Sequence, residues 1–175
     1  MGVEANLSSK KGPGIVLQPE EGEGYWQPRT ANGHVIVKVS PEVSGSQSAS
    51  MGMQIIAPGC YVSEHSHTPN EEILFCYSGK GMVIVDGVGH PFVPGTTVYA
   101  GPNAKHKIVN DGPEELKMVW VYMPSGLDQY FSSIGRPRRP GEAAPDPFER
   151  PGNVSEIEER SGTLRKPVSG STGRS

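Results

Sequence analysis

Residues 59–79 read GCYVSEHSHTPNEEILFCYSG and contain two histidines and three glutamates, residue types whose side chains can bind metal. His65 and His67 are separated by one residue, so on a strand both imidazoles point to the same face. Glu72 follows a short turn, near the start of the next predicted strand, and His106 opens a later one. Three imidazoles and a carboxylate are a suitable ligand set for a divalent transition metal. The sequence therefore predicts a metal site formed by His65, His67, Glu72 and His106.

Short runs rich in β-branched and aromatic residues recur along the chain between Gly, Pro and Asn-Asp breakers. They cover residues 34–40, 51–56, 71–77, 81–86, 96–100, 106–110 and 116–123. Strands this short and this regular are typical of an all-β sandwich or barrel. Asp86 and Gly87 suit a two-residue hairpin turn, because Gly adopts positive φ without strain.

One short C-terminal helix is predicted by apolar residues at i, i+3, i+4 and i+7. These residues are Leu127, Tyr130, Phe131 and Ile134. Ser125 is the expected N-terminal cap and Gly135 ends the helix. The helix either closes one end of the barrel or contacts a second subunit.

A chain of 175 residues allows one domain. We expect an extended N-terminal arm in residues 1–30 and a compact unit in residues 31–135. Residues 136–175 form a Pro- and Arg-rich C-terminal arm with few residues to bury, and its end is expected to be disordered. Both arms are candidates to cross a subunit interface.

The net charge of −3 provides no field to attract phosphate backbones, so nucleic acid is not an expected partner. No apolar stretch reaches the ~20 residues of a membrane span, and the N-terminus lacks the apolar segment of a signal peptide. We therefore expect a soluble, cytoplasmic protein with no membrane partner. Cys60 and Cys76 are expected to be free thiols.

The stretch around the paired histidines resembles the first cupin motif at every fixed position. The matching pattern is Gly59-x5-His65-x-His67-x4-Glu72-x6-Gly79. Chance would produce it about 2 × 10⁻⁴ times per chain. The second cupin motif is present in part, as Gly95-x5-Gly101-x-Asn103-x2-His106-x3-Asn110, with Gly101 and Asn103 in place of its proline and second glycine.

The resemblance covers residues 50–123 and implies a cupin double-stranded β-helix, or jelly-roll, barrel with the metal inside. It also selects Glu72 over Glu71, because neighbouring residues of a strand point to opposite sides and the gap to Gly79 matches Glu72. Such barrels commonly pair, which implies a homodimer or a higher homo-oligomer.

Several further residues are candidates for the substrate site. Glu72 is either a metal ligand or an acid-base group beside the metal. Tyr61 shares strand parity with His65 and His67, so it either donates a hydrogen bond to substrate or packs. The expected pocket residues are Met53, Leu74, Cys76 and Ile108, with Cys76 alternatively a small buried hydrophobe. The row Met51, Met53 and Ile55 is implied to be buried beside the metal. His34 and His90 belong to no cluster and are expected in surface or loop positions.

The leading functional hypothesis is a non-haem Fe(II) dioxygenase for a small oxygenated aromatic or enolisable carbonyl compound, with O₂ as co-substrate. The C-terminal arm also resembles those of small quercetinase-like cupins. Mn, Ni, Co and Zn are alternative metals. A second hypothesis is a lyase, isomerase or cyclase that uses the metal as a Lewis acid, with Glu72 or Tyr61 moving a proton. A third is a cupin that binds a small molecule without turnover.

Overall fold

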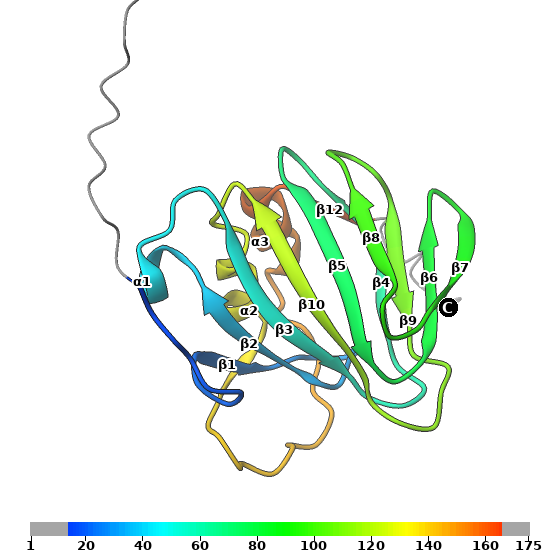
Figure 1. Cartoon of the computed structure of the whole chain (residues 1–175), viewed down its shortest axis with the longest axis horizontal. Helices are drawn as coiled ribbons and strands as arrows, with labels where there is room; N and C mark the ends of the chain where they lie inside the picture. The colour runs from blue at the N-terminus through cyan, green and yellow to red at the C-terminus, as the bar shows by residue number, and fades with distance from the viewer. Residues whose placement is uncertain (1–13, 166–175) are drawn as a thin grey trace, which may run out of the picture.

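The computed structural model describes residues 14–165, which form two β-sheets packed face to face (Figure 1). The larger sheet has the strand order β11-β1-β2-β3-β10-β5-β8. Its strands are β1 (Glu23–Trp26), β2 (His34–Val39), β3 (Ser50–Ile56), β5 (Glu71–Ser78), β8 (Thr97–Ala100), β10 (Leu116–Met123) and β11 (Arg136–Arg138).

The smaller sheet has the order β12-β4-β9-β6-β7. Its strands are β4 (Tyr61–His67), β6 (Gly81–Val85), β7 (Val88–Phe92), β9 (His106–Val109) and β12 (Thr163–Arg165). Within each sheet, all neighbouring strands are antiparallel. The predicted all-β fold is confirmed, and each run predicted as a strand overlaps one.

The inner faces of the two sheets form one core, with Trp120 fully buried at its centre. Trp120 lies over Gly52 of the neighbouring strand β3, where an added Cβ would come within 2.3 Å of the indole. Glycine is therefore required at this position by a close approach. The predicted hairpin joins β6 to β7, and both Asp86 (φ 47°) and Gly87 (φ 85°) have the positive φ of a two-residue turn.

Within residues 14–165, three short helices accompany the sheets: α1 (Pro41–Ser44), α2 (Gln129–Ile134) and α3 (Val154–Ser161). The predicted helix is α2, and Gly135 follows it as expected. Its predicted cap is wrong, because Asp128 occupies the N-cap and the Ser125 hydroxyl instead donates to the Gln47 carbonyl oxygen at 2.8 Å. No helix in residues 14–165 is long and apolar enough to span a membrane.

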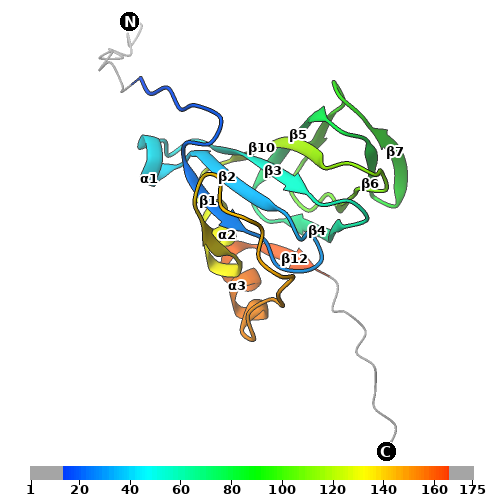
Figure 2. The same ribbon diagram turned by 90° about the horizontal axis from the view of Figure 1, so that it is seen from below.

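Residues 136–165, here called the C-terminal strap, return along the barrel instead of extending away from it. Strand β11 pairs with β1, and β12 pairs with β4. Between them, α3 buries Ile157 in the core cluster. Figure 2 shows the strap crossing over β1 and β2 on its way to α3, with β12 beside β4. Residues 1–13 and 166–175, which include the segment predicted to be disordered, lie outside the described residues.

The strands and the helix in the segments predicted as arms were missed at the level of sequence, because these segments have few apolar residues. β1 adds Tyr25 and Trp26 to the larger sheet, and Trp26 is buried. The strap is held mainly by strand pairing and ion pairs, which leave no hydrophobic periodicity in a sequence. A single buried residue of α3, Ile157, is too weak a signal to predict a helix.

Candidate metal centre

The four predicted ligands meet between the two sheets. His65 and His67 lie on β4, His106 on the adjacent strand β9, and Glu72 on β5 of the opposite sheet. One ligand atom from each residue lies within 4.8 Å of the others, and all four side chains are buried. The structure therefore brings together side chains that are up to 41 positions apart in the chain, His65 to His106.

Two of the imidazoles are held by carbonyl oxygens two residues earlier in the chain. His65 Nδ1 lies 2.8 Å from the Ser63 oxygen, and His106 Nδ1 lies 3.1 Å from the Ala104 oxygen. A carbonyl oxygen only accepts, so Nδ1 of a neutral ring carries the proton and Nε2 keeps a free lone pair. This is the arrangement in which histidine ligates a metal.

The third imidazole is held by the C-terminal strap. His67 Nδ1 lies 3.4 Å from Thr163 Oγ1, and the two residues face each other in the β4·β12 pair. In addition, the His67 carbonyl oxygen accepts a hydrogen bond of 2.8 Å from Asn103 N, which ties the loop before β9 to the end of β4. Nothing in the sequence indicated that Thr163 lies here, because strand β12 is only three residues long.

Three buried ligand atoms make no hydrogen bond within residues 14–165: His67 Nε2, His106 Nε2 and Glu72 Oε2. They nevertheless face one another, with Glu72 Oε2 at 2.7 Å from His106 Nε2 and 3.3 Å from His67 Nε2. Buried polar atoms without partners are costly, and a divalent ion would satisfy all three at once. The donor set of three imidazoles and one carboxylate fits such an ion.

The electrostatics of the cluster keep His65 neutral and Glu72 ionised, the forms in which these two side chains bind metal. Burial lowers the pKa of His65 well below its usual value, and the neighbouring His106, Arg165 and His67 lower it further, so this ring stays neutral. Burial would raise the pKa of Glu72, but His106 and His67 outweigh burial and lower the pKa to about 2. Glu72 is therefore ionised throughout the physiological range.

Tyr122 is a functional candidate that the sequence did not identify. It lies on β10 directly across from Glu72, and its ring centroid is 5.3 Å from that of His67. The pKa of Tyr122 is raised well above its usual value, first by burial and then by the charge of Glu72 and a side-chain hydrogen bond to it. Alternation along β10 put Tyr122 on one face with Trp120, but the sequence alone did not say which face is the inner one.

The second cupin motif has its expected geometry despite its substitutions. Asn103 replaces a glycine and has φ 66°, a left-handed conformation that Asn adopts more readily than most residues. Asn110 is fully buried, and its Nδ2 donates to the carbonyl oxygens of Ile56 and Glu114 at 2.9 and 2.8 Å. The departure therefore leaves both the turn and His106 in place.

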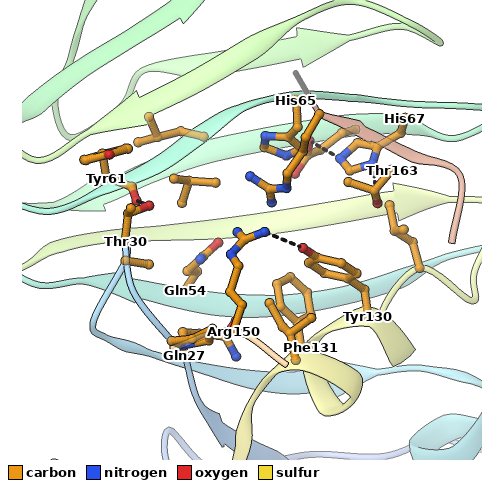
Figure 3. Close-up of a pocket in the computed structure, with 18 of the residues that line it drawn as sticks. Gln27, Thr30, Gln54, Tyr61, His65, His67, Tyr130, Phe131, Arg150 and Thr163 are labelled. Carbon is orange, nitrogen blue, oxygen red and sulfur yellow. Dashed lines mark hydrogen bonds and ion pairs between the residues drawn. The ribbon is translucent and has the colours of Figure 1, made fainter. Parts of the chain in front are cut away.

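A cavity with a free volume of about 40 Å³ adjoins the cluster, which is room for a small ligand or a few water molecules. Figure 3 shows its labelled side chains converging from the sheets, α2 and the strap. Its apolar lining includes Ile108, Met118, Leu127, Phe131 and Ile134. Its polar lining includes Gln27, Gln54, Tyr130, Arg150 and Arg165. Helix α2 thus closes one end of the barrel, one of the two roles expected for it.

The expected pocket residues are only partly in this cavity. Ile108 lines it, whereas Leu74 and Cys76 face inward on β5 as predicted but lie fully buried in the core, outside the cavity lining. The expectation that Met53 lines the pocket is wrong, because Gly52 and Gln54 are the residues of β3 that face inward. Met53 lies on the outer face of the larger sheet, beside Leu17 and Val119.

The parity argument for Tyr61 also fails, because β4 contains a β-bulge. Val62 pairs with Ile108 and His65 with His106, so three steps on β4 match two on β9. The extra residue reverses the alternation between Tyr61 and His65. The Tyr61 ring lies 4.8 Å from Lys107 Nζ and is 37% exposed, and Figure 3 places Tyr61 at the end of the cavity away from His65 and His67.

The two remaining histidines have different environments. His90 is exposed on β7, as expected. His34 begins β2 and is partly buried, with its ring edge-on to Trp26 at a centroid distance of 5.4 Å. Neither residue contacts the metal centre. The expectation of a surface or loop position is wrong for His34, because β1 and its Trp26 cover this end of the sheet.

Comparisons with known proteins agree with this geometry. The cupin domain family matches residues 52–122. Protein SchB of Streptomyces halstedii is 30% identical over 96 residues, which span 55% of this chain and 70% of SchB. The dimethylsulfoniopropionate lyase DddW of Ruegeria pomeroyi is 30% identical over 90 residues, spanning 49% of this chain and 58% of DddW.

A solved structure shows the same fold. The RmlC-like cupin of Shewanella frigidimarina superimposes with a TM-score of 0.55 at 14% identity, covering 67% of this chain and 97% of that protein. The jelly-roll sheets, the motif residues of the metal centre and these matches lead to one assignment: the chain belongs to the cupin superfamily.

Proposed function

We propose that this protein is a metal-dependent enzyme that acts on a small molecule bound beside a divalent ion. The observation that carries the proposal is the set of three orphaned, buried ligand atoms, His67 Nε2, His106 Nε2 and Glu72 Oε2, which converge next to a cavity. His65 completes the set, with its Nδ1 held by Ser63. The ion would supply Lewis-acid polarisation of a substrate oxygen and, if it is iron, redox chemistry with O₂.

The leading reaction class is an Fe(II)-dependent dioxygenase for an oxygenated aromatic or enolisable carbonyl compound. The apolar lining of the cavity supports it, because Ile108, Met118, Leu127, Phe131 and Ile134 would exclude water from a reactive oxygen species. Four protein ligands also leave two positions of an octahedral ion for substrate and O₂. The small free volume favours a compact substrate over a large polycyclic one.

A second candidate is a lyase, isomerase or cyclase. Two observations favour it: the hydroxyl of Tyr122 lies beside Glu72 in the cavity, where it could exchange a proton with bound substrate, and one relative is a lyase. In this reaction Glu72 or Tyr122 moves the proton. Tyr61, the donor expected from the sequence, lies too far toward the cavity rim to take this role.

The test is metal analysis of anaerobically purified protein, followed by O₂ uptake after Fe(II) loading with phenolic ketones and β-dicarbonyls. We expect about one metal per chain in the wild type and a metal affinity at least about 100-fold lower in His106→Ala, because one of four ligands is lost. His90→Ala is the matched control, since His90 is exposed on β7, and it should bind metal like the wild type.

Substrate-dependent O₂ uptake that disappears in His106→Ala supports the dioxygenase. Stoichiometric metal together with turnover of a substrate without O₂ uptake supports the lyase or isomerase class. Absence of metal binding by the wild type, or equal binding by His106→Ala, contradicts the proposal as a whole.

A further inference from the structure

The cavity beside the metal centre contains two guanidinium groups that lie outside the part of the chain matched by the cupin family. Arg150 and Arg165 both belong to the C-terminal strap, whereas the family match ends at residue 122. We propose that Arg150 and Arg165 bind a carboxylate of the substrate, so that the protein acts on a small carboxylic acid. The inference rests on the proposed metal-dependent function and adds its substrate class.

Arg165 is held firmly next to the metal ligands. It lies opposite His65 in the β4·β12 pair, and its Nη1 donates to the Ser63 oxygen at 3.2 Å, the same oxygen that holds the His65 ring. Its Nε makes an ion pair of 2.8 Å with Glu158 Oε1. A guanidinium fixed in this way is preorganised to bind an anion with little entropic cost.

Arg150 approaches the same cavity from the segment before α3. Its Nη1 lies 2.8 Å from Glu158 Oε1 and 3.5 Å from the Tyr130 hydroxyl. Figure 3 shows its side chain extending into the middle of the cavity, between Gln54 and Tyr130. The guanidinium therefore faces the free space and not the outer surface of the strap.

The two guanidinium groups share a single carboxylate. Both ion pairs use the same atom, Glu158 Oε1, so one positive charge is left over. Among the described residues that line the cavity, Glu72 is the one acid, and it faces the histidines. An ion pair with Glu158 that anchors the strap thus accounts for one of the two guanidinium charges. With a divalent ion held by Glu72 and the histidines, the cavity would carry excess positive charge, which an anion would compensate.

Gln54 provides a second, independent indication of a polar ligand. Gln54 is 7% exposed and lines the cavity, and its side chain makes no hydrogen bond among residues 14–165. A buried amide without partners offers a donor and an acceptor to whatever occupies the cavity. Figure 3 places Gln54 next to Arg150, where it would contact the same ligand.

The chemistry and size of the cavity define the ligand. Guanidinium groups bind carboxylates through paired hydrogen bonds, and the carboxylate would lie between the strap and the metal ligands. The free volume of about 40 Å³ favours a small carboxylic acid over a large one.

The test is isothermal titration of malonate, with its neutral analogue malonamide, into zinc-loaded and metal-free full-length protein. We expect malonate to bind the wild type at least about tenfold more tightly than malonamide, and Arg150→Gln to weaken malonate at least about tenfold. Arg160→Gln is the matched control. It removes the same charge from the strap, but Arg160 is exposed and makes no ion pair within the described part of the chain, so malonate should bind unchanged.

Arg165→Lys is a second variant that keeps the charge and loses the planar fork, and we expect it to weaken malonate about tenfold as well. Zinc content and thermal melting of each variant verify that the fold and the metal centre are intact. Equal malonate affinity in wild type, Arg150→Gln and Arg165→Lys, or equal affinity for malonate and malonamide, overturns the inference even if zinc binds normally. If the wild type fails to take up added zinc but still binds malonate in an Arg150-dependent way, the anion site is supported and the proposed metal-dependent function is contradicted.

Discussion

Individual atoms decide what each histidine of the metal centre does. The Nδ1 atoms of His65 and His106 face carbonyl oxygens two residues earlier in the chain, which leaves their Nε2 atoms directed at the cluster. His67 depends instead on a hydroxyl from a distant strand, Thr163. Orientation of the rings by partners behind them raises ligand basicity and fixes the binding geometry before metal arrives.

Tyr122→Phe tests whether the hydroxyl beside Glu72 supports the metal centre. The change keeps the buried ring and removes the hydrogen bond to Glu72, so we expect metal affinity to fall by roughly tenfold with little change in melting temperature. Competition with a metal-chelating dye measures the affinity. Tyr99→Phe is the matched control, because Tyr99 is exposed on β8. Unchanged affinity in Tyr122→Phe would show that its hydroxyl does not support Glu72.

His34 makes stability depend on pH. Burial, together with the charge of Arg138, lowers its pKa from 6.5 to about 4. Between these values the unfolded chain binds a proton that the folded chain does not, so the free energy of unfolding decreases as pH falls from 6.5 to 4. His34→Gln cannot take up this proton. We therefore expect the wild type to lose more stability than His34→Gln between pH 7 and pH 4.

Urea unfolding midpoints of both proteins at the two pH values measure this difference. His90→Gln, altered at the exposed histidine of β7, should keep the wild-type pH dependence. If His34→Gln and the wild type lose equal stability on acidification, protonation of His34 is not coupled to folding.

At the scale of elements, the bulge in β4 serves the metal centre. It inserts one residue between Val62 and His65 and leaves the Ser63 carbonyl free to hold both the His65 ring and Arg165. The same bulge turns Tyr61 away from the ligands. Alternation with a period of two predicts facing residues within a regular strand, but a bulge is decided by the register with the neighbouring strand and is not visible in the sequence.

The strap supplies the last elements of the fold and part of the site. We expect a chain truncated after Gly135 to melt roughly 5–10 °C lower, because burial of Ile157 alone contributes about 1.5–3 kcal/mol and the pairing of β11 and β12 is lost as well. Its metal affinity should fall about 10- to 100-fold, since His67 loses Thr163.

Calorimetry and dye competition measure the two effects of truncation. Truncation after Arg165 is the control, because it removes only residues 166–175 and keeps the whole strap. Sedimentation velocity of the same proteins tests whether the strap also supports the predicted homodimer. Equal melting temperature and metal affinity in the two truncated chains would show that the strap contributes to neither.

At the scale of the whole molecule, two sheets converge on one small space. Each sheet provides ligands to the same cluster, and α2 with the strap closes the space at one end. The family match covers the strands that carry the ligands, whereas the cationic side of the cavity comes from residues beyond it. The residues of the family motifs and those of the proposed anion site therefore lie in different segments of the chain.

The sequence by itself determined the all-β class, seven of the strands, α2, and the four residues that the fold brings into one buried cluster. These features depend on local alternation and on the spacing of His65, His67, Glu72 and His106 in motifs. Such local patterns can be recognised in a sequence without knowledge of the fold. Tertiary structure alone decided that Tyr122 faces Glu72, that Met53 and Tyr61 do not reach the ligands, and that Arg150 and Arg165 line the cavity. The physical reason is that strand register, sheet facing and the path of a strap held by ion pairs depend on contacts between residues far apart in the chain.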